Sequence, residues 1–258
     1  MSDPTAGGSA PVPEGVRTLP GAGHPGAVTR LVLVRHGESA CSVAGVIGGP
    51  RGCTGLSGQG RLQAARLRDR LMATGEARTA VALYSSPLAR ARETAEAIAP
   101  GVGDGSLAVI EDCGLCELHP GEADGLRWEE YSRRYQVPDF EADPDMEVAP
   151  GGESWSGFVA RASAALEHLA TRHPGGLVVV ACHAGVVESA FLEFLPIDTA
   201  TRRLRLPTAN TSITEFERDP DRWRLVRYND STHLAPGAFA PPTRQGAVSG
   251  GLIQASGD

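Results

Sequence analysis

The 258-residue sequence has no excess of basic side chains. It holds 31 acidic residues against 24 lysines and arginines, which leaves a formal net charge of -7. A general nucleic-acid or polyanion binder needs a basic face, because its affinity comes largely from counterion release. The composition therefore argues against a nucleic-acid partner. It leaves room for one small basic pocket that takes a small anion.

Long apolar runs are also missing. No stretch reaches the length of a transmembrane helix, and the first 27 residues, rich in Gly, Pro, Ala and Ser, contain no apolar core of a secretion signal. The last residues have the same composition. We therefore expect no membrane association, a disordered tail over residues 1–29, a single domain over residues 30–232 and a flexible tail over residues 233–258.

Cysteines are few and odd in number. An odd count without a secretion signal predicts free thiols in a reducing cytoplasm. Cys113-x-x-Cys116 is followed by His119, but a zinc site takes four ligands, or three and a water. No HExxH or HxH spacing occurs elsewhere, so we predict no metal and no cofactor. The five cysteines are Cys41, Cys53, Cys113, Cys116 and Cys182.

Apolar strands alternate with amphipathic helices along the chain. This order predicts an α/β domain with a mostly parallel sheet, whose ligands bind beyond the carboxyl ends of the strands. Two short strands, "NTSITEFERD" and "RWRLVRYN", are expected to close the domain as a hairpin after a third, "RRLRLP". The main predicted strands are Leu31–Val34, Ala80–Ser86, Leu107–Asp112 and Gly176–Cys182. The main predicted helices are the segment between the caps Ser57 and Gly75, Pro87–Ala99, Glu153–His173 and Ala184–Leu195, with a short one in "GLRWEEYSRRY".

Polar groups stand at or just beyond the ends of the four main strands. Arg35 and His36 end the first, Arg90 lies one turn into the helix after the second, Glu117 follows the third and His183 ends the fourth. Cationic groups gathered at one sheet edge are costly unless an anion neutralises them. Arginine presents a fork that matches phosphate oxygens. The joint placement predicts a phosphate site, although each residue alone has a more ordinary interpretation on a surface or in a core.

Histidine adds chemistry to this site. Neutral imidazole is a nucleophile, so a histidine in line with phosphorus can take the phosphoryl group onto nitrogen. The arginines would stabilise charge on the equatorial oxygens. Glu117, between apolar neighbours Leu115 and Leu118, is the carboxyl group we expect to protonate the leaving alkoxide and then to activate water.

Several segments together resemble the histidine phosphatase superfamily, the group that includes phosphoglycerate mutase. The resemblance covers roughly residues 30 to 230 and implies a three-layer α/β/α sandwich. It implies that His36 is the phosphorylated nucleophile, that Arg35, Arg90 and His183 hold the phosphoryl group, and that Glu117 is the proton donor. The matching segments are "LVRHGES", "IGGPRGCTGLSGQGRLQA", "YSSPLARARETAEAIA", "LCELHPGEADGLRWEEY", "PGGESWSGFVAR" and "VVVACHAGVV".

The resemblance also suggests substrate-binding positions. Gly48 and Gly49 fall where the family's glycine loop approaches the substrate, although a simple flexible turn is the alternative. Ser42 stands where many members have asparagine, and its hydroxyl can still donate to phosphate. Arg51 belongs to extra residues in the same loop, and Ala184 replaces a glycine of many members. These departures leave the catalytic groups intact and the substrate open.

Residues 136–153 decide between two activities. Mutases of the family supply extra basic residues after the acid loop, whereas this stretch is acidic, "QVPDFEADPDMEVAPGGE". We therefore predict a metal-independent phosphomonoester phosphatase that acts on a small phosphorylated metabolite. The alternatives are a phosphoglycerate mutase-type transferase, a protein phosphatase of the same fold and a catalytically silent binding module. The sequence allows a homodimer but does not determine the oligomeric state.

Overall fold

The computed structural model describes residues 28–195, 206–220, 222–236 and 238. Within them, one sheet has the strand order β3-β2-β4-β1-β5-β6. Strands β3, β2, β4 and β1 run parallel, and β5 is antiparallel to both of its neighbours. The predicted mostly parallel α/β sheet is confirmed. The strands are β1 (Thr29–Arg35), β2 (Ala80–Ser85), β3 (Val109–Glu111), β4 (Leu177–Cys182), β5 (Ile213–Arg218) and β6 (Trp223–Asp230).

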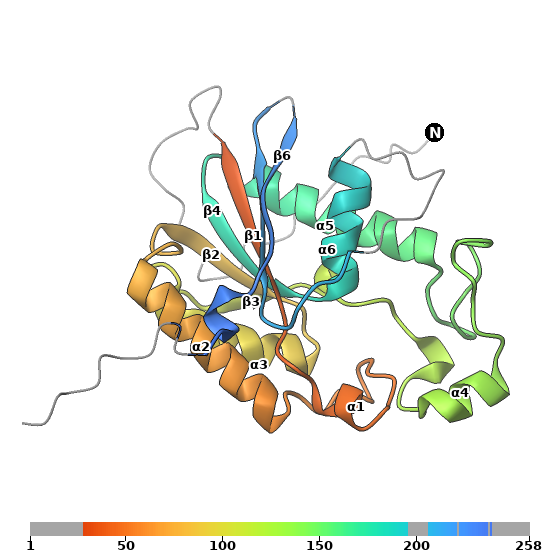
Figure 1. Cartoon of the computed structure of the whole chain (residues 1–258). Coiled ribbons are helices and arrows are strands. Elements are labelled where there is room, and N and C mark those ends of the chain that lie inside the picture. Colours follow the sequence, from red (N-terminus) through yellow and green to blue (C-terminus); the bar gives the residue numbers. More distant parts are fainter. Residues whose placement is uncertain (1–27, 196–205, 221, 237, 239–258) are drawn as a thin grey trace, which may run out of the picture.

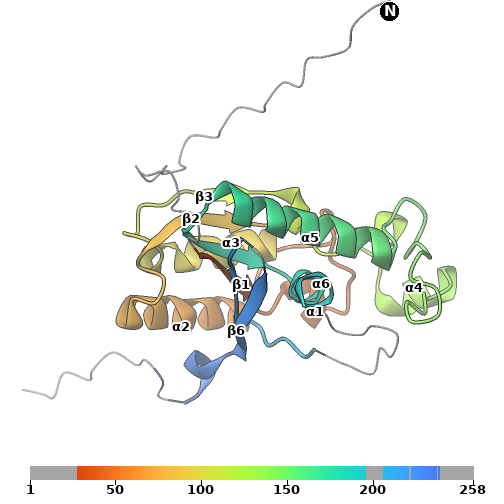
Figure 2. The same ribbon diagram turned by 90° about the horizontal axis from the view of Figure 1, so that it is seen from above.

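Two helical layers cover the sheet, as Figures 1 and 2 show. Along β1, Leu31 and Leu33 join the core cluster under one layer, whereas Val32 and Val34 join the cluster under the other. Successive side chains of a strand point to opposite faces, so a strand that is apolar throughout is covered on both sides. The first layer is α5 (Trp155–Arg172) and α6 (Ala184–Phe194); the second is α2 (Gly58–Thr74) and α3 (Ala89–Ile98).

Most predicted helix ends agree with the structure. The Ser57 hydroxyl accepts a hydrogen bond from the Gly60 N–H at 2.9 Å and begins α2. Gly75 ends α2 in the left-handed region, with φ of +68°. Helix α3 begins two residues after the predicted Pro87, because the Ser86 hydroxyl accepts from the Leu88 N–H at 3.2 Å and turns the chain first. Helix α4 (Trp128–Arg134) was expected, but the one-turn α1 (Ala40–Val43) was not.

The C-terminal part of the domain confirms the predicted hairpin. Strands β5 and β6 pair antiparallel. The third predicted strand, "RRLRLP", falls largely outside the described residues, and Leu206 and Pro207 are not in a strand. The predicted boundaries at residues 29/30 and 232/233 stay predictions, and most of both tails lies outside the described residues. His233 itself is fully buried, and its Nε2 lies 2.9 Å from the Thr211 hydroxyl.

No helix in the described part of the chain is both long and apolar enough to cross a bilayer.

Candidate active site

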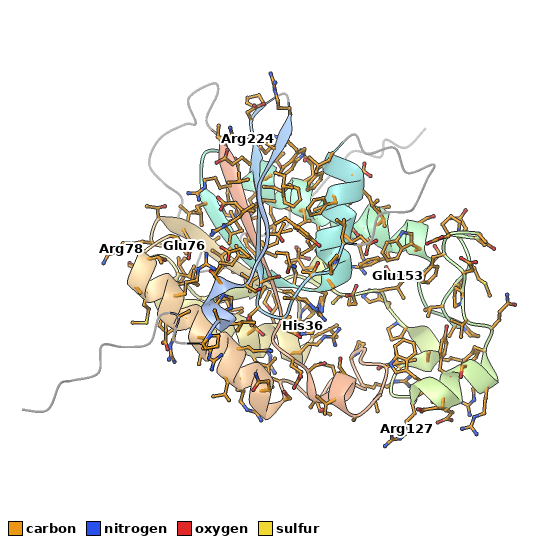
Figure 3. All side chains as sticks on the ribbon, viewed as in Figure 1. His36, Glu76, Arg78, Arg127, Glu153 and Arg224 are labelled. Atoms are coloured by element: carbon orange, nitrogen blue, oxygen red, sulfur yellow. The ribbon has the colours of Figure 1, made fainter. Side chains whose placement is uncertain are left out.

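The register of β1 and β4 brings two histidines together. The strands are parallel neighbours and pair Arg35 with Cys182, so the next residues, His36 and His183, lie side by side at the carboxyl edge of the sheet. The His36 N–H donates to the Cys182 carbonyl at 2.9 Å. The two imidazole rings meet edge to face with centroids 5.1 Å apart. Both side chains are buried, and Figure 3 shows His36 at the centre of the molecule.

Hydrogen bonds assign the tautomer of His36. Its Nδ1 lies 2.6 Å from the Gly37 carbonyl oxygen, which can only accept, so Nδ1 carries the proton. The Arg90 Nε–H donates to the His36 Nε2 at 3.1 Å, which requires a lone pair on Nε2. Both contacts agree on one tautomer. Nε2 is therefore the nitrogen that can act as a nucleophile.

Arg90 is held from a second side by a loop. Its Nη1 donates to the Gly48 carbonyl at 2.6 Å. A Cβ on Gly48 would lie 2.4 Å from the Cys41 sulfur and 3.2 Å from the Arg90 Nη1. Only glycine fits this position without a shift, so the loop can approach the guanidinium this closely. We call residues 48–52 the glycine loop.

Three buried polar atoms around His36 have no hydrogen-bond partner within the described chain. They are the Nε of Arg35 and both ring nitrogens of His183. The rest of the Arg35 guanidinium is fixed, because its Nη1 donates to the Thr208 carbonyl. Buried polar groups are nearly always paired in folded proteins. Unpaired groups beside two arginines match an anionic ligand with several acceptor oxygens.

Burial and charge keep both histidines neutral. Burial, reinforced by the positive charge of Arg90, holds the pKa of His36 well below its usual value. Burial is also the largest cause for His183, whose pKa is likewise well below the usual value, followed by Arg90 and His36. His36 is thus an unprotonated nucleophile at neutral pH. A bound dianion would raise the pKa of His183 and so favour its protonated form, which donates a hydrogen bond to the ligand.

Glu117 reaches the same edge from the loop after β3. Its Oε2 accepts a hydrogen bond from the Gly185 N–H at 3.2 Å, two residues beyond His183. A Cβ on Gly185 would lie 2.3 Å from the Glu117 Oε1, so the missing side chain leaves room for the carboxylate. The negative charge of Glu117 also acts on Arg35, whose pKa is nevertheless lowered, mainly by burial. The structure thus brings all five predicted catalytic residues to one sheet edge.

Comparison with known families agrees with this geometry. The family model described as the histidine phosphatase superfamily, branch 1, matches residues 31–231. The chain belongs to the histidine phosphatase superfamily. The predicted resemblance is thereby confirmed, and with it the phosphatase class at the level of the family.

Two curated relatives and a solved structure illustrate the similarity. A metal-independent phosphoserine phosphatase of Arabidopsis thaliana is 33% identical, over 82% of this chain and 86% of its own. A phosphoglycerate mutase-like protein of the same plant is 32% identical, over 81% and 88%. The mycobacterial glucosyl-3-phosphoglycerate phosphatase, solved with VO3, superposes with a TM-score of 0.65 at 26% identity, covering 78% of this chain and 99% of that one. These neighbours confirm the three-layer fold.

Two predicted substrate-binding residues of this histidine phosphatase make other contacts. The Ser42 hydroxyl lies 2.7 Å from that of Ser39, at the start of α1. The Arg51 side chain is 71% exposed, and its Nε lies 3.5 Å from the Asp124 carboxylate. Gly49 does belong to the loop beside Arg90, but its N–H donates to Asp124 at 2.8 Å. The predicted roles of these residues remain predictions.

Asp124 is the residue that the sequence analysis missed. Its Oδ1 accepts from the N–H groups of Gly49 and Gly52 at 2.8 and 2.9 Å, and its Oδ2 accepts from the Arg51 N–H at 2.8 Å. One carboxylate thus organises the whole glycine loop and, through Gly48, the position of Arg90. No local pattern could have revealed it, because each contact spans more than 70 residues of sequence.

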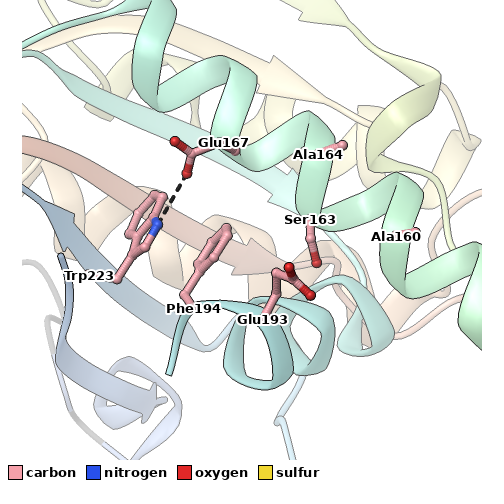
Figure 4. A pocket seen from close by; sticks show the side chains of 7 residues that line it. All are labelled: Ala160, Ser163, Ala164, Glu167, Glu193, Phe194 and Trp223. Atoms are coloured by element: carbon pink, nitrogen blue, oxygen red, sulfur yellow. Dashed lines mark hydrogen bonds between the residues drawn. The ribbon is translucent and has the colours of Figure 1, made fainter. Parts of the chain in front are cut away.

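A separate hollow lies on the surface between α5, α6 and β6 (Figure 4). There the Trp223 indole N–H donates to Glu167 at 3.1 Å. This hollow contains none of the predicted site residues, and we assign it no part in the chemistry. Its lining residues are Ala160, Ser163, Ala164, Glu167, Glu193, Phe194 and Trp223.

Proposed function

We propose that this protein is a phosphomonoester phosphatase that transfers the phosphoryl group of a small metabolite to His36 and then to water. The observation that carries the proposal is the His36 Nε2 lone pair, which faces the Arg90 guanidinium at 3.1 Å beside the unpaired groups of Arg35 and His183. The proposal agrees with a structural neighbour of the same fold, a glucosyl-3-phosphoglycerate phosphatase that was solved in complex with VO3 and with inorganic phosphate.

The first step forms a phosphorus–nitrogen bond. The Nε2 lone pair of His36 attacks phosphorus as the ester oxygen leaves, and Glu117 gives that oxygen its proton. Arg90 exchanges its contact with Nε2 for the phosphoryl oxygens, where Arg35 and His183 also donate. Their charge lowers the repulsion between nucleophile and dianion and stabilises the equatorial oxygens in the transition state.

The second step returns the enzyme to its starting form. Glu117, now a carboxylate, takes a proton from water, whose oxygen attacks phosphorus as the bond to Nε2 breaks. Inorganic phosphate leaves, and His36 regains its lone pair. Nδ1 keeps its proton and donates it to the Gly37 carbonyl throughout, which holds the ring in line.

Residues 136–153 support hydrolysis over mutase chemistry. Asp139 and Asp143 serve the segment's own turns, because the Asp139 carboxylate accepts from the Glu141 N–H at 3.0 Å and the Asp143 carboxylate from the Asp145 N–H at 3.2 Å. The acidic side chains of this segment are exposed, except for the half-buried Glu153; the exposed ones are Asp139, Glu141, Asp143, Asp145 and Glu147. A mutase must also hold a second phosphate, and a stretch this acidic is a poor lining for one.

The names of two relatives narrow the substrate class. Phosphoserine and glucosyl-3-phosphoglycerate are both small phosphoesters that carry a carboxylate. We propose a substrate of that class. No contact among the residues that the structure describes favours a phosphorylated protein.

A panel of phosphorylated metabolites tests the proposal. Phosphate release from O-phosphoserine, 3-phosphoglycerate and neutral sugar phosphates should be measured beside interconversion of 2- and 3-phosphoglycerate. We expect release from at least one phosphorylated acid, no interconversion and no loss of activity with EDTA. Interconversion faster than release would overturn the phosphatase in favour of the mutase.

We also propose a location in the cell for this enzyme. All five cysteines are free thiols, which supports a reducing compartment such as the cytoplasm. Cell fractionation checks the location. Light scattering on the purified protein tests whether it forms the homodimer that the sequence allows. The structure contains a single chain and gives no evidence for a dimer.

A further inference from the structure

The side chains of two cysteines and a histidine meet beside the active site. The sulfur atoms of Cys113 and Cys116 are 3.2 Å apart, and the Nε2 of His119 lies 3.7 Å from the Cys113 sulfur. All three ligand atoms lie within 4.8 Å of one another. Around a tetrahedral Zn²⁺, bond lengths of about 2.3 Å to sulfur and about 2.0 Å to nitrogen separate such atoms by about 3.5–3.8 Å. Changes of about 1 Å in these separations would therefore accommodate the ion.

The backbone holds the two cysteines in place without help from a metal. Asp112 caps the short 3-10 helix Cys113–Leu115 by accepting from the Gly114 N–H at 2.7 Å. The Arg161 guanidinium donates to the carbonyls of Cys113, Gly114 and Cys116 at 3.2, 2.9 and 3.1 Å. A site of this kind is preorganised, so binding an ion would cost little ordering of the chain.

Glu153 supplies the support that metal-binding histidines usually have. Its carboxylate lies 3.6 Å from the His119 Nδ1 and accepts from the His119 N–H at 2.9 Å. Glu153 is fixed in turn by two hydrogen bonds from Arg161, both of 2.7 Å. A carboxylate on the Nδ1 side of the ring favours the proton there, and the other ring nitrogen faces the thiols. The Ser86 hydroxyl donates to the Cys116 sulfur at 3.6 Å.

We propose that Cys113, Cys116 and His119 form a site for a borderline-soft divalent cation such as Zn²⁺, with a water as fourth ligand. The sequence alone predicted no metal, because it showed three ligands and nothing of the carboxylate behind the histidine. The proposed ion is structural. It takes no part in the chemistry at His36, and the loop that carries Glu117, between Cys116 and His119, is already held by hydrogen bonds from Arg161 and to Glu153 without the ion.

Binding must release protons from the two thiols. Only the thiolate is a metal ligand, so the ion takes up the thiolates and the protons pass to solvent.

Cobalt provides the test. The full chain, reduced with a phosphine, should bind one equivalent of Co²⁺ with thiolate-to-cobalt charge-transfer and tetrahedral d–d absorption, and Zn²⁺ should displace it. Cys113→Ser and His119→Gln should abolish this spectrum. Glu153→Gln should weaken binding by about 10–100-fold. His168→Gln, which changes an exposed histidine outside the cluster, should bind like the parent.

The result is independent of the proposed phosphatase activity, because the spectrum needs no turnover. A reduced chain without the charge-transfer band overturns the proposal. So does a band that persists unchanged in both Cys113→Ser and His119→Gln, provided that circular dichroism shows each variant folded.

Discussion

Replacing Asp124 by alanine should loosen the glycine loop that holds Arg90. The Asp124 carboxylate accepts three backbone N–H groups at 2.8–2.9 Å, from Gly49, Arg51 and Gly52. Removing it leaves these donors without an acceptor. A buried donor without a partner costs about 1–3 kcal/mol.

The three N–H donors differ in their exposure to solvent, and this difference sets how much stability the Asp124→Ala variant loses. Gly49 is buried and Gly52 half-buried, whereas Arg51 is exposed and its amide can turn to water. The buried Gly49 donor costs about 1–3 kcal/mol and the half-buried Gly52 donor about 1 kcal/mol, which together predict a loss of about 2–4 kcal/mol in the free energy of unfolding. Asp124→Asn keeps an oxygen for some of the bonds, so about 1–2 kcal/mol is expected.

Activity should fall with stability, because the Gly48 carbonyl accepts from the Arg90 Nη1 at 2.6 Å and moves with the loop. We expect kcat/KM to drop by about tenfold or more, equivalent to about 1.4 kcal/mol of transition-state stabilisation. Urea unfolding and kinetics measure the two effects. Asp145→Ala, which removes an exposed carboxylate of the acidic segment, is the control. An Asp124→Ala variant within about 0.5 kcal/mol of the parent and fully active would refute the role of Asp124.

The remaining predictions concern the proton donor and the buried histidines. Glu117→Gln should slow esters with poor leaving groups far more than p-nitrophenyl phosphate, and equal losses on both would remove Glu117 as the acid. Gly185→Ala places a Cβ 2.3 Å from the Glu117 Oε1 and should cause the same selective loss, whereas Gly58→Ala, where a Cβ meets nothing within 4 Å, should not. Because the pKa values of His36 and His183 are lowered on folding, the unfolded chain binds more protons, so stability is present above pH 6.5 and is lost below it. Urea unfolding at pH 5.5 should therefore show a loss of about 1.4 kcal/mol for each of these two histidines relative to pH 7.5, and equal stability at both values would contradict their neutral state.

Strand patterns predicted the scaffold of the site well. Val32 and Val34 face one helical layer and Leu31 and Leu33 the other, so an unbroken apolar run correctly indicated a strand covered on both faces. Parallel strands end at one edge, which is why the position of His183 in the sequence sufficed to place it near the nucleophile.

Strand patterns do not predict the contacts that loop residues make. The motif predicts Ser42 and Arg51 as substrate-binding residues. In the structure Ser42 contacts Ser39, and Arg51 contacts Asp124. Asp124 and Glu153 act across long sequence separations, and periodicity carries no information about such pairs. The ligand cluster at Cys113 shows the same limit, since its supporting carboxylate lies in a different segment.

The central claim is that His36 becomes covalently phosphorylated. Rapid acid-free quenching of the enzyme with a 32P-labelled substrate, followed by peptide mapping, tests it most directly. A base-stable, acid-labile phosphoryl group should appear on the peptide that contains His36 within the first turnover and be absent from His36→Ala, which should also be inactive. Sustained turnover by His36→Ala, or a phosphoryl group on another residue, would contradict the account.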